Sequence, residues 1–515
     1  MCGIAALHSP NHRLGAVLRD VPAELMLDRL AHRGPDDTGI REVGGHTWLG
    51  HRRLSIVDLE GGHQPLGGAG GADGWSLVCN GEIYNHAELR ARFGGGHLDS
   101  SSDSAAALAV LRAEGPAGLH RLRGMWALCA ATPGGRFVAA RDAVGIKPLY
   151  WARTGDCVHF ASELRAFDPA VQAGAAIFPP GCWWTPEDGL HRFADAVPEP
   201  VRDDAWAGRS PETVERATYE TVCDSVRRHL MADVEVGVFL SGGLDSSLVA
   251  AVAAREYADR GRRLKTFAVG TAGSPDLLAA RDAAAFLDTE HHEALLTAPG
   301  AAKVLPDVVR CVESFDASLI RSAVPNWFLS ELAAQHVKAV LTGEGADEIF
   351  AGYGSYHERF AGADDLDHEL RRTIGALHGL NLQRCDRVTM AHGLEARVPF
   401  LDRDVMAHGM SLPASLKCLD PDGTEKGHLR RAFTGMLPEH LLWRRKAQFG
   451  TGSGAESVLS PRWHTRITDA AFTAAVADER TPELRSKEEL AYYRIFREAL
   501  PGVDPDAVLT RFATA

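Results

Sequence analysis

The chain has 515 residues, of which 45% are hydrophobic, so it can build large cores, and its length predicts two to four domains, with two fitting best. A net charge of −13 argues against a nucleic-acid-binding surface. The nine cysteines show no C-x-x-C spacing, which argues against a zinc site or a disulfide framework and favours a reducing cytoplasm, and no stretch reaches transmembrane length, so no membrane partner is expected.

The chain begins Met1-Cys2-Gly3-Ile4. If Met1 is removed, Cys2 carries both a thiol, which is a good nucleophile once deprotonated, and an α-amine of ordinary pKa, roughly 8, that can act as its base. The apolar run over residues 2–7 is too short for the hydrophobic region of a signal peptide, and no basic segment precedes it. This terminus therefore predicts a catalytic cysteine rather than a secretion signal.

Four further segments carry polar and charged side chains that can take part in chemistry. The segments that carry such groups are His32-Arg33-Gly34-Pro35-Asp36, Arg53 with Leu54-Ser55-Ile56-Val57-Asp58, Asn80-Gly81-Glu82-Ile83-Tyr84-Asn85, and Ser102-Asp103.

In order and spacing, these segments resemble the glutaminase domain of class II, N-terminal nucleophile amidotransferases, over about the first 190 residues. The resemblance implies a four-layer αββα fold and hydrolysis of glutamine, with Cys2 as the nucleophile. The side-chain amide of Asn80 and the N–H of Gly81 would donate to the oxyanion. Glutamine is a zwitterion whose α-carboxylate calls for an arginine and whose α-ammonium calls for carboxylates. The resemblance accordingly implies a glutamine-binding set made of Arg53, Asn80, Gly81, Glu82 and Asp103.

Short alternating or apolar runs in this part predict a layered antiparallel sheet. Turn and linker signals then appear at residues 197–200 and 209–211, and helical periodicity follows over residues 212–231. We therefore expect a glutaminase domain over residues 1–195, a linker over 196–212 and a second domain over 213–515. The runs that predict strands are residues 75–79, 125–131, 136–140 and 158–161.

The second domain opens with an apolar strand over residues 235–240, a Gly-rich turn and an Ala-rich helix over 248–255. A strand, such a turn and a helix hold phosphate in α/β proteins, because unpaired N–H groups and the helix dipole point at the anion. The turn lacks the Gly-Lys-Ser/Thr of a Walker loop, and its SGGxDS pattern is that of the pyrophosphate loop of adenylating enzymes. The turn reads Ser241-Gly242-Gly243-Leu244-Asp245-Ser246-Ser247.

A second strand over residues 338–341 leads into the turn Thr342 to Glu348, and a helix is expected to begin at Ile349. Open α/β sheets bind ligands at the carboxyl ends of their strands. Mg²⁺ prefers one or two carboxylates together with phosphate oxygens. We therefore expect Asp245 and Asp347 to hold this metal.

Over nearly its whole length the chain resembles glutamine-dependent asparagine synthetases of the B type. Further matches are residues 267–270, 352–353, 395–402, 425–426 and 443–446. The resemblance implies a parallel-sheet α/β ATP-pyrophosphatase domain with added helices, and a reaction in which ATP and Mg²⁺ activate aspartate as β-aspartyl-AMP. Ammonia from glutamine then reaches this intermediate through an internal tunnel. The resemblance is also compatible with a cytoplasmic enzyme and with a homodimer.

The same resemblance assigns roles in the second domain. Glu344 and Lys446 are the expected catalytic residues there. The expected ATP-binding residues are Leu240, Ser241, Gly242, Gly243, Asp245, Ser246, Val269, Thr342, Gly343 and Tyr353.

One departure leaves the acceptor acid open. Where the most similar type of synthetase reads Thr-Thr-x-Arg, this chain has Ser318-Leu319-Ile320-Arg321. Ser318 and Arg321 keep a hydroxyl and a carboxylate-binding cation, so we place both in the acceptor pocket. Aspartate is the expected acceptor, and another carboxylic acid of a specialised biosynthetic pathway is the alternative.

Three other functions fit less well. A lactam-forming relative would commonly lose the N-terminal cysteine, which is present here. A tRNA-modifying ATPase with the same loop would need a basic surface, which the net charge disfavours. A non-catalytic scaffold would not need Cys2, Asp245, Glu344 and Lys446 together.

Overall fold

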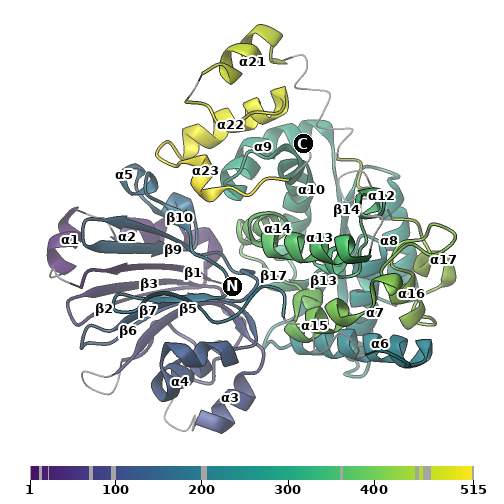
Figure 1. Cartoon of the computed structure of the whole chain (residues 1–515), viewed down its shortest axis with the longest axis horizontal. Helices are drawn as coiled ribbons and strands as arrows, with labels where there is room; N and C mark the ends of the chain where they lie inside the picture. The colour runs from purple at the N-terminus through teal and green to yellow at the C-terminus, as the bar shows by residue number, and fades with distance from the viewer. Residues whose placement is uncertain are drawn as a thin grey trace.

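A computed structural model of the chain shows two packed units (Figure 1). One is built on two stacked antiparallel sheets, and the other on a parallel sheet surrounded by helices. The described residues are 2–10, 14–20, 23–68, 74–93, 100–198, 206–359, 363–446, 452–455, 466–478 and 480–512.

The N-terminal unit confirms the four-layer αββα fold. Two six-stranded antiparallel sheets lie face to face, with α1 and α2 outside the first and α3 and α4 outside the second (Figure 1). The first sheet has the order β10 (Ala176–Ile177), β8 (Tyr150–Thr154), β9 (Cys157–Ala161), β1 (Gly3–His8), β3 (Thr47–Arg53) and β2 (Asp37–Val43), and the second β12 (Gly189–Arg192), β11 (Cys182–Thr185), β7 (Phe137–Arg141), β6 (Gly124–Ala131), β5 (Ser76–Ile83) and β4 (Leu66–Gly67). The outer helices are α1 (Leu14–Asp20), α2 (Ala23–Asp28), α3 (His86–Phe93) and α4 (Ser104–Glu114).

Burial along the strands explains why this sequence forms layers. β2 alternates between half-buried and exposed side chains, as an edge strand does, whereas every residue of β1 and β5 is buried. β1 and β5 lie in the middle of the stack, in contact with one another. Residues at the start of β1 and along β5 therefore face an interior that water reaches poorly.

The C-terminal unit confirms the parallel α/β sheet. Its five strands have the order β15 (Glu290–Leu295), β14 (Lys265–Gly270), β13 (Val236–Phe239), β16 (Ala339–Leu341) and β17 (Glu395–Arg397), and all neighbours pair in parallel. The helices are α6 (Pro211–His229), α7 (Leu244–Ala258), α8 (Pro275–Phe286), α9 (Ala298–Val312), α10 (Ala317–Ala334), α11 (Ala346–Ile349), α12 (Gly354–Arg359), α13 (Ala363–Ala376), α14 (Asn381–Met390), α15 (Arg403–Ser411), α16 (Gly427–Ala432), α17 (Glu439–Leu442), α21 (Asp469–Val476), α22 (Lys487–Ala499) and α23 (Pro505–Val508).

The helix expected to begin at Ile349 instead ends there. α11 starts three residues earlier, after Gly345 with φ of 93°. Glycine reaches this left-handed conformation without strain, so the chain turns at once into a helix. Asp347 and Glu348 consequently lie in the first helical turn, where the dipole favours acidic groups.

The division between the domains stays a prediction. β12 ends at Arg192, and α6 begins at Pro211, two residues inside the expected linker. Residues 199–205 of that linker lie outside the described part of the chain.

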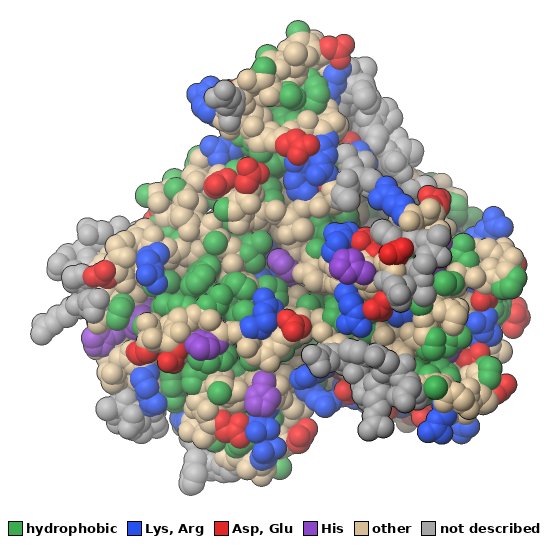
Figure 2. All heavy atoms as spheres, viewed as in Figure 1, with side chains coloured by type: hydrophobic (Ala, Val, Ile, Leu, Met, Phe, Trp, Pro, Cys, Tyr) green, Lys and Arg blue, Asp and Glu red, His purple; other side chains and the backbone are tan. Residues whose placement is uncertain are grey.

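The two units share buried cores. One cluster joins Leu54, Ile56 and Met125 of the N-terminal unit to Val222 and Val238 of the C-terminal unit. On the face shown in Figure 2, basic and acidic side chains are interspersed. None of the helices in the described ranges is long and apolar enough to cross a membrane.

Candidate functional site

The expected nucleophile lies immediately before β1 and is buried, with 7% of Cys2 exposed. Its backbone N–H donates to Asn80 Oδ1 over 3.0 Å, and its carbonyl accepts from Arg33 Nε over 3.0 Å. Burial raises the pKa of the Cys2 thiol. The thiol therefore needs a nearby base to become a thiolate at neutral pH.

The oxyanion-hole candidates sit beside it on β5. The bond from Cys2 to Oδ1 orients the Asn80 amide, and its Nδ2, which is buried, has no hydrogen-bond partner among the described residues. Gly81 has φ of 144°, and a Cβ there would lie 1.9 Å from the Met125 carbonyl oxygen, so only glycine fits. An unpaired amide donor next to a thiol is what an oxyanion would require.

The three charged groups expected to bind glutamine are all buried, and each already has a neighbour. Arg53 donates to backbone carbonyls of the loop that follows β3, and Asp103 Oδ2 accepts from Ile83 N over 2.6 Å. Glu82 Oε2 lies 3.6 Å from Nη2 of Arg397, which comes from β17 of the other unit. Burial raises the pKa of both Glu82 and Asp103. Arg397 therefore contacts the expected glutamine-binding set, a role that sequence reasoning did not assign to it.

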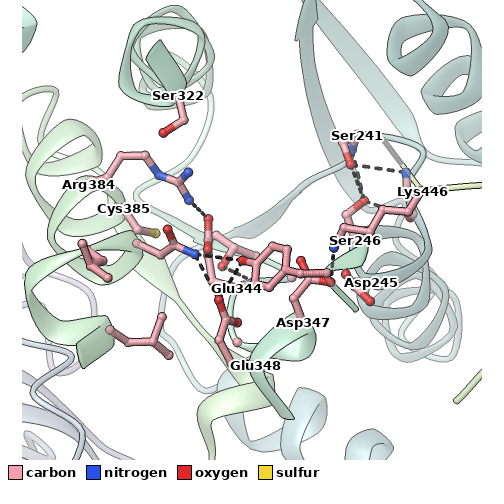
Figure 3. A pocket seen from close by; sticks show the side chains of 18 of the residues that line it. Ser241, Asp245, Ser246, Ser322, Glu344, Asp347, Glu348, Arg384, Cys385 and Lys446 are labelled. Atoms are coloured by element: carbon pink, nitrogen blue, oxygen red, sulfur yellow. Dashed lines mark hydrogen bonds and ion pairs between the residues drawn. The ribbon is translucent and has the colours of Figure 1, made fainter. Parts of the chain in front are cut away.

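The synthetase residues meet in one cavity of about 530 Å³. In Figure 3, Ser241, Asp245, Ser246 and Lys446 lie at one end, while Glu344 lies farther along near Arg384. Every expected ATP-binding, acceptor, metal and catalytic residue of this half lines the cavity except Gly242.

The turn that holds Ser241 is folded in advance of any ligand. Gly242 has φ of 70°, and a Cβ on it would lie 2.5 Å from the backbone of α8, so its role is close packing rather than lining. Ser246 Oγ lies 3.0 Å from Ser241 Oγ, and Ser241 Oγ accepts from Gly243 N over 3.3 Å. The N-terminus of α7 follows directly, which fits an anion-binding site.

The two expected metal ligands converge on one cation. Lys426 Nζ lies 2.7 Å from Asp245 and 2.5 Å from Asp347 Oδ1, and Lys446 also pairs with Asp347. Although burial raises it, these two ammonium groups bring the pKa of Asp347 well below its usual range. Asp245 and Asp347 thus lie close enough to bind one cation together, and carboxylate oxygens are the ligands that Mg²⁺ prefers, so the two residues fit this metal. Lys426 itself received no role from sequence, although residues 425–426 marked the resemblance.

Glu344 and Glu348 form the far wall of this region. Glu344 pairs with Arg384 of α14, and burial raises its pKa. Glu348 accepts from the Tyr353 hydroxyl over 2.7 Å and from Asn381 Nδ2 over 3.2 Å. Burial and the Asp347 carboxylate raise the pKa of Glu348 to about 7. Glu348 is thus a buried carboxyl with a raised pKa that sequence reasoning did not single out.

Glu348→Gln is expected to stabilise the protein more at pH 8 than at pH 5. Between the unfolded value of 4.5 and about 7, the folded protein keeps a proton that the unfolded chain has lost, so the free energy of unfolding falls as pH rises through this window. Glutamine removes the buried charge, a gain of at most about 3 kcal/mol at pH 8. Thermal unfolding at both pH values measures it, with the exposed Glu358→Gln as control. An equal Tm difference at both pH values would contradict the raised pKa.

The acceptor candidates lie on α10. Ser318 and Arg321 line the cavity, but Arg321 Nη2 donates to Glu488 Oε2 of α22 over 2.7 Å. Tyr492 also donates to this carboxylate, over 2.7 Å. The carboxylate that Arg321 binds here therefore belongs to the chain itself, and the local motif did not reveal Glu488 as its partner.

Comparison with known proteins gives matches in both halves. The family model of the glutamine amidotransferase domain matches residues 1–178, and that of asparagine synthase matches residues 217–363 and 357–508. The chain is 37% identical to a probable glutamine-hydrolysing asparagine synthetase of Schizosaccharomyces pombe, over 99% of this chain and 95% of that protein. It is 36% identical to the enzyme of Asparagus officinalis, over 97% and 86%, and 36% identical to asparagine synthetase B of Escherichia coli, over 93% and 88%.

These matches run through both units and include the segments that form the cavity and the Cys2 site. The chain therefore belongs to the family of glutamine-hydrolysing asparagine synthetases.

Proposed function

We propose that this protein makes asparagine from aspartate, with ATP as the activating substrate and glutamine as the nitrogen donor. The observation that carries the proposal is the single cavity in which the pyrophosphate loop, two convergent aspartates and Lys446 meet, in a chain that also holds Cys2 against Asn80. The first half-reaction supplies ammonia and the second consumes it.

In the first half-reaction, the Cys2 thiolate attacks the side-chain amide carbon of glutamine. Asn80 Nδ2 and the Gly81 N–H stabilise the oxyanion, and ammonia leaves. Water then hydrolyses the thioester to release glutamate. Once Met1 is removed, the α-amine of Cys2 is the base that takes the thiol proton, and it then gives this proton to the leaving amide nitrogen, which departs as ammonia. Arg53, Glu82 and Asp103 are proposed to hold the zwitterionic end of glutamine.

In the second half-reaction, the aspartate β-carboxylate attacks the α-phosphorus of ATP, and pyrophosphate leaves. The loop residues around Ser241 bind the phosphates, and Lys446 stabilises negative charge on the phosphoryl oxygens. Asp245 and Asp347 would hold Mg²⁺, which would neutralise phosphate charge. Ammonia then attacks the acyl carbon and AMP leaves, with Glu344 orienting the ammonia or accepting its proton.

Two observations support a carboxylic acid other than aspartate as the alternative acceptor. The segment 318–321 departs from the usual pattern, and Arg321 is paired with Glu488. For aspartate to bind Arg321, its carboxylate has to replace or share the Glu488 contact. An acid with a different shape or charge would also have to accommodate the pair of Arg321 and Glu488, through contacts different from those of aspartate.

ATP-dependent pyrophosphate release over a panel of carboxylic acids, with ammonium supplied, distinguishes these acceptors. We expect aspartate to give the highest kcat/KM and to yield asparagine and AMP. A higher kcat/KM for another acid, with its amide as product, would establish the alternative. ADP as the product would contradict adenylation.

We also propose a cytoplasmic enzyme that functions as a homodimer. All nine cysteines lie among the described residues and carry free thiols, and Cys418 is exposed. Free thiols are the rule in a reducing compartment.

A further inference from the structure

One arginine ties the nucleophile of the glutaminase unit to the synthetase unit. Arg33 is fully buried at the end of the short 3₁₀ helix Ala31–Arg33. Its Nε donates to the Cys2 carbonyl over 3.0 Å. Its Nη1 and Nη2 donate to the two carboxylate oxygens of Asp386, over 2.8 and 3.2 Å. Asp386 belongs to α14, 353 residues away in the chain.

The Cys2 backbone depends on side chains for its hydrogen bonds. Its N–H is held by Asn80 and its carbonyl by Arg33, because Cys2 precedes the first residue of β1. Gly3 adds close packing, since a Cβ there would lie 3.0 Å from Leu30 Cβ in the turn that leads to Arg33. The direction of the Cys2 side chain is therefore coupled to the position of the Arg33 guanidinium.

Two carboxylates bind that guanidinium at the same time. Nη1 of Arg33 also donates to Glu163 over 2.8 Å, and Glu163 is shared with Arg165 at 2.9 Å and Arg387 at 3.2 Å. The bidentate contact with Asp386 fixes the plane of the guanidinium, which a single contact does not. Without the Asp386 carboxylate, Nη2 loses its acceptor, and the guanidinium is held only through Nε and Nη1.

The helix that carries Asp386 also reaches the other active site. Two residues earlier on α14, Arg384 pairs with Glu344 in the synthetase cavity. α14 thus lies between the two sites, with one charged residue directed to each.

We propose that Asp386 of the synthetase domain is a positioning residue for the glutaminase reaction. It fixes Arg33, which fixes the Cys2 carbonyl and so directs the thiol at the amide carbon of glutamine. The glutaminase site is then complete only when the synthetase domain is docked. This inference rests on the proposed role of Cys2.

The test is steady-state kinetics of full-length Asp386→Asn. Loss of a charged, bidentate hydrogen bond is expected to lower the kcat for glutamine hydrolysis roughly tenfold or more, while the KM for glutamine changes by less than about twofold. Ammonia-dependent synthesis should stay within about threefold of wild type, because α14 and Arg384 are retained. Arg33→Lys, which keeps the charge but loses the fork, should give the same pattern. Asp386→Glu should recover part of the kcat.

The matched control is Lys338→Ala. It removes another ion pair between the units, Lys338 Nζ with Asp36 Oδ2 at 2.6 Å, which does not contact Cys2. Both activities should be unchanged in this variant. Wild-type glutaminase kcat in Asp386→Asn or Arg33→Lys would overturn the inference, and so would a parallel loss of both activities, which marks a purely structural role. If Asp386→Asn is insoluble, Arg33→Lys decides. Glutaminase activity in Cys2→Ala would instead refute the proposed nucleophile.

Discussion

Cys2→Ala is expected to abolish glutamine-dependent asparagine formation and to leave ammonia-dependent formation at the wild-type level. The thiol is the only part of Cys2 that the substitution removes, and the contacts of its backbone with Asn80 and Arg33 are retained. Removal of a nucleophile is expected to lower kcat by on the order of 10⁴-fold or more. Product formation with glutamine and with ammonium chloride, measured in parallel, gives both numbers.

Cys79→Ala is a suitable control for this experiment. Cys79 is a buried thiol of β5, next to Asn80, but it has no role in the proposed chemistry. This variant should keep both activities. Loss of ammonia-dependent synthesis in folded Cys2→Ala would contradict two separable sites. Terminal sequencing of active enzyme should begin at Cys2, because an uncleaved Met1 blocks the α-amine.

Lys446→Ala is expected to stop the synthetase half-reaction before the acyl-adenylate forms. Lys446 lies against Asp347 and 4.7 Å from the centre of the Tyr353 ring, in the same cavity as the pyrophosphate loop. A cation in this position stabilises charge that grows in the transition state, so its loss should cost about 10²–10³-fold in kcat. Transfer of ¹⁸O from carboxyl-labelled aspartate to AMP measures this step directly.

Two companion variants sharpen this prediction. Glu344→Ala should still form acyl-adenylate but convert little of it to product, whereas Lys446→Ala should form almost none. Lys303→Ala removes an exposed lysine of α9 and should behave as wild type. Wild-type label transfer in Lys446→Ala would remove both the role of Lys446 and the adenylation argument built on it.

Local sequence patterns were sufficient to predict individual strands and helices whose formation depends on neighbouring residues. The strand before Ser241 and the helix after it follow from an apolar run, a Gly-rich turn and an Ala-rich stretch. The apolar runs that predicted strands at residues 125–131 and 158–161 likewise lie within β6 and β9. The start of α11 was misplaced, because the left-handed Gly345 inside the turn determines it.

The groups that sequence missed reach the site through tertiary contacts. Lys426 is 181 residues from Asp245, and Glu488 is 167 residues from Arg321. Periodicity along the sequence does not reveal contacts between residues so far apart in the chain. Glu348 was adjacent to a predicted ligand, but its raised pKa depends on burial, which only the packed structure provides.

The central claim is that the amide nitrogen of glutamine is transferred to aspartate within one protein. To test this claim, wild-type enzyme at low concentration is supplied with amide-¹⁵N glutamine, aspartate and ATP in the presence of excess unlabelled ammonium. Mass spectrometry then measures the ¹⁵N content of the product. We predict asparagine whose ¹⁵N content exceeds that of the free ammonia in solution, together with one AMP for each asparagine. Asparagine whose ¹⁵N content only equals that of the free ammonia, or a product other than asparagine, would contradict the account.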